Sequence, residues 1–295
     1  MKIGFIGIGK MGGGMARRVL EAGYDLTVND VSKEKARNLL EKGAKWTDTP
    51  EGIAVSCQIV LSCLSGPPEV EAVVYGPAGL LAGWKKGDLY VDMSTNSSIL
   101  IRRVAETAKL KGVTVLYAPV SGGVTGAEAG TLTIMVGGEA QSLEKVRKIL
   151  EAMGNKIFHC GEVGFGNVAK VVNNLIGATC NAINAECFVL GVKAGMDPKK
   201  LFDVTRVSSG NSRSLEQDLP KVLEGDFEPG FRLVLSLKDI GLALAMGKEY
   251  GVPMPVGSAV EQRFMEAKAR GLGEKASRSI FLLSEEETGV KVRSR

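Results

Sequence analysis

Lys170 and Asn174 are the residues of this sequence whose spacing best suits acid–base chemistry. They stand four residues apart in a stretch rich in valine, leucine and isoleucine, and residues at this spacing share one face of a helix. Apolar surroundings disfavour a charged ammonium and lower the pKa of a lysine toward the range in which a general base works. A lysine at the edge of an apolar face can also extend into water, so periodicity alone leaves both roles open.

The sequence contains a single histidine, His159, among its 295 residues. A metal site with two histidine ligands is therefore excluded, and a Ser-His-Asp triad could use only this residue. If the chain is an acid–base enzyme, we expect lysine, a carboxylate or tyrosine to carry the proton. We predict no metal site.

A glycine-rich segment near the N-terminus, Gly7-Ile8-Gly9-Lys10-Met11-Gly12, follows a short apolar run and opens a helical pattern. Asp30 follows about 20 residues later, which completes the context of a dinucleotide-binding fingerprint. The glycines permit a tight turn, let the backbone approach a pyrophosphate, and let the helix pack on its strand. The residues expected to contact the cofactor here are Gly7, Ile8, Gly9, Lys10, Met11, Gly12, Asn29 and Asp30.

The same region offers one alternative, because Gly4 to Lys10 spells the G-x-x-x-x-G-K of a nucleoside-triphosphate loop. Met11, however, stands where that loop needs Ser or Thr for Mg²⁺, and Gly4 falls inside the predicted strand. The dinucleotide fingerprint is therefore favoured.

Asp30 bears on the choice between NAD and NADP. A carboxylate at the end of the second strand accepts from both ribose hydroxyls and repels a 2′-phosphate. No arginine follows it directly, although Lys33 could reach a phosphate. NAD is therefore favoured as the cofactor, with NADP possible.

A third segment, Ser121-Gly122-Gly123, follows the predicted strand 113–117. It should lie at the carboxyl edge of the sheet, where open α/β sheets bind ligands. Its hydroxyl and backbone N–H groups could hold a carboxylate, although a flexible turn would have the same composition.

Short apolar runs and helical patterns alternate over the first part of the chain. The predicted strands are 2–6, 25–28, 58–64, 89–93, 113–117, 131–136 and 156–159. The predicted helices between them include 11–22, 33–40 (capped by Ser32), 53–56, 68–75, 98–109 and 142–153. Alternation of this kind, with strands that are apolar throughout, predicts an α/β fold whose parallel, doubly wound Rossmann-type sheet is covered on both faces.

After Gly166 only helical patterns remain. They cover 167–194, 198–207, 212–224, 232–250, 254–270 and 274–284, and the last ~10 residues are polar and expected to fray. We predict an NAD(P)-binding Rossmann domain, 1–163, and an all-α C-terminal domain, 164–295, for substrate binding and dimerisation, joined by the long helix.

Charge, hydropathy and cysteines exclude other classes of protein. The net charge of +4 is spread along the chain, without the basic stripe of a nucleic-acid-binding protein. No uninterrupted apolar run reaches the ~20 residues of a membrane helix. The segment 1–9 has the pattern of a strand, so we expect it not to be a signal peptide. Five cysteines without a C-x-x-C pattern suit reduced thiols in the cytoplasm.

Five ordered segments together resemble the β-hydroxyacid dehydrogenase family over essentially the whole chain. They are GFIGIGKMGGGMARRVLEAGY (4–24), DMSTNSS (92–98), APVSGGVTGAEAGTLTIMVGG (118–138), GFGNVAKVVNN (164–174) and LKDIGLAL (237–244). Members of this family include 3-hydroxyisobutyrate dehydrogenase, 2-(hydroxymethyl)glutarate dehydrogenase and tartronate semialdehyde reductase.

The resemblance implies a role for each segment. Lys170 would be the general acid/base, and Asn174 would orient the substrate. The substrate would further contact Ser121, Gly122, Gly123 and Asn173, with the first three holding its carboxylate. The cofactor would further contact Leu64, Ser65, Thr95 and, from the helical domain, Lys238. The alternative for Lys238 is an exposed lysine paired with Asp239.

The sequence departs from the family pattern at three positions. Ser65 stands where proline is common, Asn96 where Val or Ile is common, and Tyr117 where Asp often precedes Ala-Pro-Val-Ser-Gly. Two relatives are disfavoured: imine reductases lack the lysine that Lys170 supplies, and 6-phosphogluconate dehydrogenases have a histidine where this chain has Asn173.

We therefore predict hydride transfer between NAD(P) and a short 3-hydroxy acid, or the corresponding semialdehyde. A semialdehyde reductase that uses NADPH, and a non-catalytic dinucleotide-binding sensor or scaffold, are the alternatives. Arg213 could bind a second substrate carboxylate or face solvent. Because the helix 167–194 is apolar over most of its circumference, we expect a homodimer or homotetramer.

Overall fold

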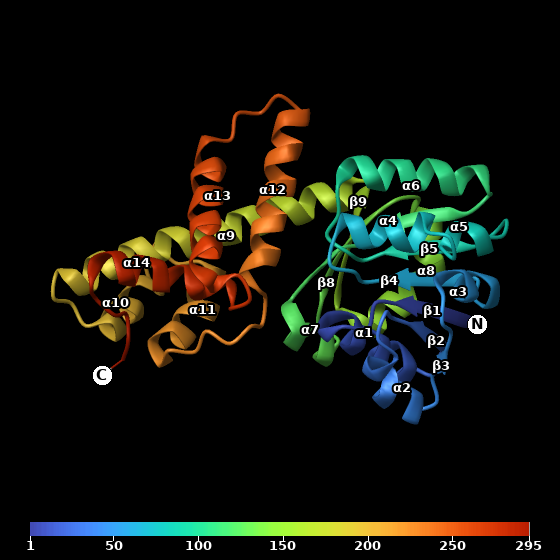
Figure 1. Cartoon of the computed structure of the whole chain (residues 1–295), viewed down its shortest axis with the longest axis horizontal. Coiled ribbons are helices and arrows are strands. Elements are labelled where there is room, and N and C mark those ends of the chain that lie inside the picture. The colour runs from blue at the N-terminus through green and yellow to red at the C-terminus, as the bar shows by residue number, and fades with distance from the viewer. Residues whose placement is uncertain (295) are drawn as a thin grey trace. The chain divides into compact units, whose positions relative to one another are not determined.

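The described part of the chain, residues 1–294 of a computed structural model, contains a nine-stranded sheet (Figure 1). Its order β3-β2-β1-β4-β5-β6 is that of a Rossmann sheet. These strands are β1 (Lys2–Ile6), β2 (Asp25–Asn29), β3 (Lys45–Trp46), β4 (Ile59–Ser62), β5 (Leu89–Asp92) and β6 (Thr114–Tyr117), all parallel. Every residue of β4 and β5 is buried, as expected where helices cover both faces. The predicted α/β Rossmann-type fold is confirmed.

The far edge of the sheet corrects the prediction of a wholly parallel sheet. β8 (Thr133–Gly137) runs antiparallel to β6 and to β7 (Val120–Ser121), and β9 (Lys156–Gly161) runs parallel to β8. The short helix α7 (Gly123–Ala129) connects β7 to β8. α7 does not return the chain to the amino edge of the sheet before β8 begins. β8 therefore starts at the carboxyl edge and runs in the opposite direction to β6 and β7.

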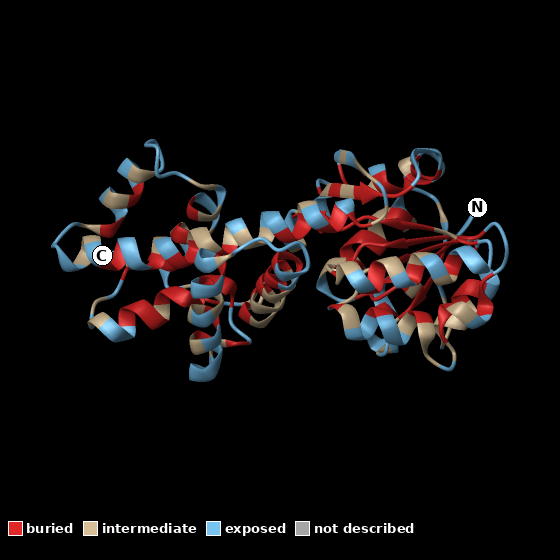
Figure 2. Cartoon of the chain, turned by 90° about the horizontal axis from the view of Figure 1, so that it is seen from above, coloured by how far each residue is buried: buried red, intermediate tan, exposed pale blue. Residues whose placement is uncertain are grey.

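Two apolar layers cover the sheet. In Figure 1, α4 and α6 lie on one side of the strands, and α1 and α2 lie on the other. The helices of this unit are α1 (Lys10–Glu21), α2 (Arg37–Glu41), α3 (Pro50–Ser56), α4 (Pro67–Tyr75), α5 (Leu80–Gly83), α6 (Ser98–Leu110) and α8 (Ala140–Met153). Figure 2 shows the strands buried between helices whose outer faces are exposed. The predicted helix 33–40 begins instead as a 3₁₀ turn (Lys33–Ala36), and the Ser32 side chain makes no cap hydrogen bond.

Helices alone form the second unit. They are α10 (Pro198–Thr205), α11 (Arg213–Glu224), α12 (Leu233–Glu249), α13 (Pro255–Ala267) and α14 (Ile280–Thr288), which follow the long helix α9 (Phe165–Lys193). Phe188, Phe264 and Phe281 are buried in their common core. Asp197 caps α10 by accepting from the Lys200 backbone N–H, which is the expected cap before a first-turn proline.

The C-terminal residues do not fray as predicted. Val292 is fully buried, and its N–H donates to Glu285 Oε1 at 2.9 Å. The Arg293 guanidinium lies 2.6 Å from the same oxygen, and the Ser294 N–H donates to the Leu223 carbonyl at 2.9 Å. One buried carboxylate therefore fixes a segment that composition alone describes as polar.

Contacts divide the chain into the units Met1–Lys170 and Val171–Arg295, a division that lies inside α9. The predicted functional domains, 1–163 and 164–295, stay a prediction. The first turn of α9 belongs with the sheet because Gly166 packs against it: a Cβ there would lie 2.3 Å from the Met135 carbonyl oxygen. Among the described helices, α9 has the length and apolar composition that a membrane span would need, as do core helices of soluble proteins.

Candidate active site

The carboxyl ends of the central strands lie level with one another. Ile6 pairs with Asn29 on one side and Ser62 on the other, Ser62 pairs with Asp92, and Asp92 pairs with Tyr117. The loops that follow these strands therefore leave the sheet at a single edge. They carry most of the residues predicted to bind cofactor and substrate: Gly7–Gly12, Asp30, Leu64, Ser65, Thr95 and Ser121–Gly123.

The glycine turn has the backbone geometry that its sequence predicts. Gly7 has a φ of 86°, which favours glycine, and its N–H donates to the Asn29 carbonyl at 2.9 Å. α1 then begins at Lys10 with Gly9 as its N-cap, which has no side chain to cap the helix. The N–H groups of this first turn are thus suited to an anion such as a pyrophosphate. Ile8 is buried and Met11 half-buried, whereas Lys10 is exposed.

Asp30 is held against this turn by three donors. The Ile8 and Ser32 N–H groups donate to its two carboxylate oxygens at 2.9 and 3.0 Å, and Lys35 Nζ lies 2.9 Å away. The lysine beside the carboxylate is therefore Lys35 and not Lys33, whose Nζ lies 5.8 Å from the centre of the Trp46 ring. Asn29 points elsewhere, because its amide donates to the Thr47 carbonyl.

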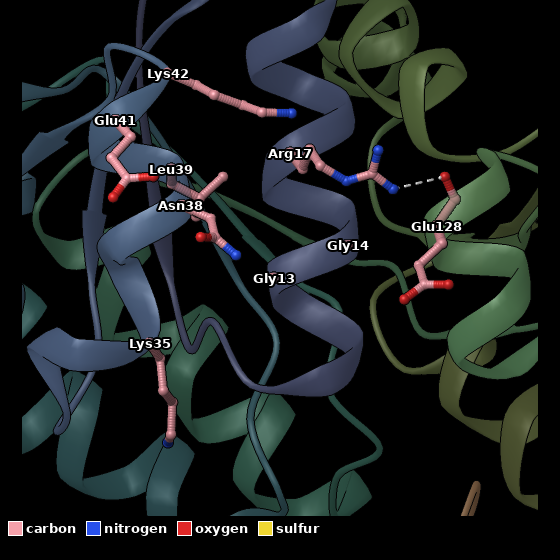
Figure 3. A pocket seen from close by; sticks show the side chains of 9 residues that line it. All are labelled: Gly13, Gly14, Arg17, Lys35, Asn38, Leu39, Glu41, Lys42 and Glu128. Atoms are coloured by element: carbon pink, nitrogen blue, oxygen red, sulfur yellow. Dashed lines mark hydrogen bonds between the residues drawn. The ribbon is translucent and has the colours of Figure 1, made fainter.

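A pocket beside the glycine turn lies between α1 and the segment 35–42, with α7 at its margin (Figure 3). Arg17 of α1 donates across it to the Glu128 carbonyl of α7 at 3.1 Å. Gly14 faces the same helix, since a Cβ there would lie 3.3 Å from Ala127. The helix of the glycine turn and the helix that follows Ser121–Gly123 are thus in direct contact.

A buried carboxylate that the sequence analysis did not single out organises the loops after β4 and β5. Asp92 accepts from Ser62 Oγ, the Ser94 N–H and Asn96 Nδ2, each at 3.0 Å. Ser94 Oγ in turn accepts from the Leu64 N–H at 2.9 Å. An acidic residue at the end of a buried apolar strand was the available signal for this network.

Asp92 should give the protein a measurable pH dependence of stability. Burial raises the pKa of its carboxyl above the ordinary value, although hydrogen bonds from Ser94, Asn96 and Ser62 oppose the rise. A carboxyl with a raised folded-state pKa contributes stability that is fully present below its unfolded pKa and is lost as pH rises through the folded pKa. Relative to Asp92→Asn, which does not titrate, wild type should lose free energy of unfolding between about pH 4 and pH 7.

Urea unfolding of both proteins at the two pH values measures this difference, because the other titrating groups cancel. A wild-type advantage that grows with pH would show instead that the three hydrogen bonds outweigh burial.

The Ser121–Gly123 segment joins two regular elements rather than forming a flexible turn. Ser121 is half-buried and pairs with Thr133 in the β7–β8 ladder. α7 starts at Gly123, with Gly122 as its N-cap, and both glycines are exposed. The segment is therefore a defined strand-to-helix junction at the carboxyl edge.

Lys170 lies in the first turns of α9 and is 9% exposed. The burial disagrees with the alternative of a lysine extended into water. Asn167, three residues before it, is also buried and contacts the Tyr117 hydroxyl through its Oδ1 at 3.3 Å. The start of α9 thus packs at the carboxyl end of β6, on the same edge as the loops above.

Asn174 is fixed by a residue that the sequence analysis treated only as the alternative partner of a lysine. Asn174 Nδ2 donates to Asp239 Oδ2 at 2.5 Å, and Lys238 Nζ lies 2.9 Å from Asp239 Oδ1. Asn173 Nδ2 donates to Asn174 Oδ1 at 3.0 Å. Asp239, which is 2% exposed, therefore orients Asn174 and also pairs with Lys238.

Two family profiles cover most of the chain. The NAD binding domain of 6-phosphogluconate dehydrogenase matches residues 2–161, and the NAD-binding domain of NADP-dependent 3-hydroxyisobutyrate dehydrogenase matches residues 164–283. The chain is 39% identical over 293 residues to 2-(hydroxymethyl)glutarate dehydrogenase of Eubacterium barkeri, covering 99% of this chain and 97% of that one. This chain belongs to the β-hydroxyacid dehydrogenase family.

Further relatives agree with this assignment. The 3-hydroxyisobutyrate dehydrogenase of Pseudomonas aeruginosa is 39% identical over 269 residues, 89% of this chain and 90% of that one. The structure of Mycobacterium tuberculosis 3-hydroxyisobutyrate dehydrogenase with L-serine superposes with a TM-score of 0.88 at 31% identity, covering 96% and 98% of the two chains. The protein is an NAD(P)-dependent hydroxyacid dehydrogenase.

His159 bonds a backbone carbonyl, whereas Arg213 is exposed. His159 Nε2 contacts the Gly138 carbonyl at 2.7 Å in the β9 region, which is a structural position. Arg213 is exposed at the start of α11. Within residues 1–294, no group of three or more His, Cys, Asp and Glu could hold a metal ion, and the five cysteines are unbridged.

Proposed function

We propose that this dehydrogenase oxidises a short 3-hydroxy acid, with Lys170 as the general acid/base. The observation that carries the proposal is the burial of Lys170 at 9% exposure, on a helix whose first turn packs at the carboxyl edge of the sheet. The same edge carries the glycine turn and the Ser121–Gly123 junction.

The glycine turn fits a dinucleotide. A Cβ at Gly9 would meet no protein atom within 4 Å, so the backbone there is open to a pyrophosphate. The residues proposed to hold the dinucleotide lie at or after the carboxyl ends of four strands, with one more inside α12. They are Gly7–Gly12, Asn29 and Asp30, Leu64 and Ser65, Thr95, and Lys238. Of these, Asn29 would act through its backbone, because its amide is bonded to Thr47.

The bound dinucleotide supplies the hydride acceptor of the reaction. Ser121, Gly122 and Gly123 would bind the substrate carboxylate through their hydroxyl and N–H groups. Asn174, oriented by Asp239, and its neighbour Asn173 would place the substrate hydroxyl beside Lys170. Neutral Lys170 Nζ would then take the hydroxyl proton during oxidation and return it during reduction.

The substrate class is proposed from relatives and tested directly. Two relatives are named for 3-hydroxyisobutyrate, and one of them is described with L-serine, which also carries a 3-hydroxyl group. The experiment is a panel of 3-hydroxy acids with NAD⁺ and NADP⁺, followed by NAD(P)H absorbance. The reverse panel offers tartronate, glyoxylate or succinic semialdehydes with NADPH. Dinucleotide binding without turnover of any compound would favour the sensor or scaffold alternative.

NAD is the cofactor that Asp30 favours. A 2′-phosphate would meet this carboxylate, which Lys35 neutralises only in part. We expect kcat/KM with NAD⁺ to exceed that with NADP⁺ by at least about tenfold, or ~1.4 kcal/mol, and Asp30→Ser to remove most of that preference. Asp25→Ser is the control, because Asp25 lies at the opposite end of β2. Better use of NADP⁺ by wild type would contradict the role given to Asp30.

A homodimer or homotetramer is proposed from the exposed face of α9. Large apolar side chains recur there at helical spacing, each at least a third exposed: Phe165, Val168, Val172, Ile176, Ile183 and Leu190. Such a stripe on one helix face is suited to a partner chain. We expect sedimentation velocity to show an oligomer that Ile176→Lys dissociates, whereas Leu110→Lys, at an exposed position on α6, does not. A monomeric wild type would overturn the proposal.

Met1–Lys170 would then provide most of the dinucleotide contacts and the Ser121–Gly123 junction, and the helical unit would provide Lys238, Asn173 and Asn174. The cytoplasmic location stays a prediction from the unpaired cysteines.

A further inference from the structure

Tyr117, at the end of β6, is the point where three segments of the first unit meet. Its side chain is 1% exposed, and its hydroxyl accepts from the Asn96 N–H at 2.8 Å. The same hydroxyl donates to the Ser94 carbonyl and lies 3.3 Å from Asn167 Oδ1. A single buried oxygen therefore contacts both the loop after β5 and the helix α9.

On the loop side, these bonds fix the residues that flank Thr95. Ser94 and Asn96 each bond the Tyr117 hydroxyl through the backbone, and both also bond the Asp92 carboxylate. Asn96 is fully buried. The backbone of Thr95 is thus held through both of its neighbours, which bond the Asp92 carboxylate as well as the Tyr117 hydroxyl.

On the helix side, the contact lies one turn before Lys170. Asn167 is 1% exposed, and its Nδ2 makes no hydrogen bond to the described residues. The Tyr117 hydroxyl has one proton, and it donates this proton to the Ser94 carbonyl. If the Asn167 amide is rotated by 180°, its Nδ2 can donate to the hydroxyl oxygen. In either orientation, Tyr117 is the polar partner of Asn167. A Cβ at Gly166 would lie 3.0 Å from the Tyr117 carbonyl oxygen, so the two backbones pack closely. The side chain and the backbone of Tyr117 therefore contact the same turn of α9.

We infer that the Tyr117 hydroxyl is a positioning group that joins the Thr95 loop to the first turn of α9 and thereby places Lys170. The inference rests on the proposed role of Lys170. Tyr117→Phe keeps the ring and its packing but leaves the Asn96 N–H without its acceptor. Small displacements between a catalytic group and its substrate can cost about 100-fold in rate, so the defect should appear in kcat.

The experiment compares Tyr117→Phe with Tyr90→Phe. Tyr90 is a fully buried tyrosine of the neighbouring strand β5, and its hydroxyl bonds Ser62 rather than α9 or the Thr95 backbone. Both variants lose one buried hydroxyl and should lose similar stability. Only Tyr117→Phe should lose kcat, by about tenfold to 100-fold, with the KM of the hydroxy acid and the Kd of the dinucleotide within about twofold.

A double-mutant cycle with Asn167→Ala adds a second readout. If both residues act through one contact, the combined variant should lose little more kcat than the worse single variant. Wild-type turnover in Tyr117→Phe, an equal loss in Tyr90→Phe, or additive losses in the cycle would overturn the inference. If Lys170→Ala is inactive and Tyr117→Phe is fully active, the role of Tyr117 is wrong and the proposed function stands. If Lys170→Ala is active, the proposed function itself is wrong.

Discussion

Lys170→Ala should lower kcat by about 10²–10⁴-fold, the range that a positioned general acid or base contributes. The free energy of unfolding should fall little, because a buried amine costs free energy in the wild-type protein and alanine is a good helix former. The Kd of the dinucleotide should stay within about twofold of wild type, because the glycine turn and Asp30 lie on other elements. Steady-state kinetics and dinucleotide titration measure both effects.

Lys170→Arg separates proton transfer from charge. Arginine keeps a positive charge but cannot give up its proton at accessible pH, so a general base is lost while an electrostatic contact is kept. We expect this variant to be nearly as inactive as Lys170→Ala. Lys193→Ala is the matched control, because Lys193 is an exposed lysine at the other end of α9. Activity retained in Lys170→Arg would leave Lys170 with an electrostatic role only.

Gly12→Ala should lower the stability of the protein, whereas Gly9→Ala should weaken dinucleotide binding. A Cβ at Gly12 would lie 1.8 Å from the Gly7 carbonyl oxygen and 3.2 Å from the Phe5 ring, so α1 would have to move away from β1. Overpacking of this kind costs about 1–3 kcal/mol or more, and we expect a clear fall in Tm without any ligand.

At Gly9, a Cβ would meet nothing in the protein. Gly9→Ala should therefore keep the Tm of wild type, yet weaken dinucleotide binding by at least about tenfold, because the methyl group occupies the approach to the pyrophosphate. Thermal unfolding and dinucleotide titration of both variants test the pair. Wild-type affinity in Gly9→Ala would show that the backbone does not approach the phosphates at this residue.

The features that the sequence predicted well depend on short-range patterns. The strands β1, β2, β4, β5 and β6 follow from apolar runs, whereas the two-residue β3 was not predicted, and the glycine turn follows from three glycines within six residues. The cap of α10 depends only on Asp197 and the proline beside it. Each is decided within a few residues, so composition and spacing suffice.

The features that it missed depend on contacts between distant residues. Asn174 and Asp239 are 65 positions apart, and nothing near either of them in the sequence specifies their hydrogen bond. The antiparallel edge arises because the connection after β7 stays on one side of the sheet. Lys35, which the sequence analysis did not consider, lies beside Asp30 and comes from a 3₁₀ turn that helical spacing did not predict.

The contact between α1 and α7 has a consequence for redesign of this enzyme. Arg17 and Glu128, 111 positions apart, join the helix of the glycine turn to the helix that continues from Ser121–Gly123. If Ser121–Gly123 binds the substrate carboxylate as proposed, we expect substitutions on that side of α1 to alter the selectivity for hydroxy acids together with dinucleotide affinity. Asp30 directly follows β2, outside this contact, and we expect it to be the position at which cofactor preference can be engineered separately.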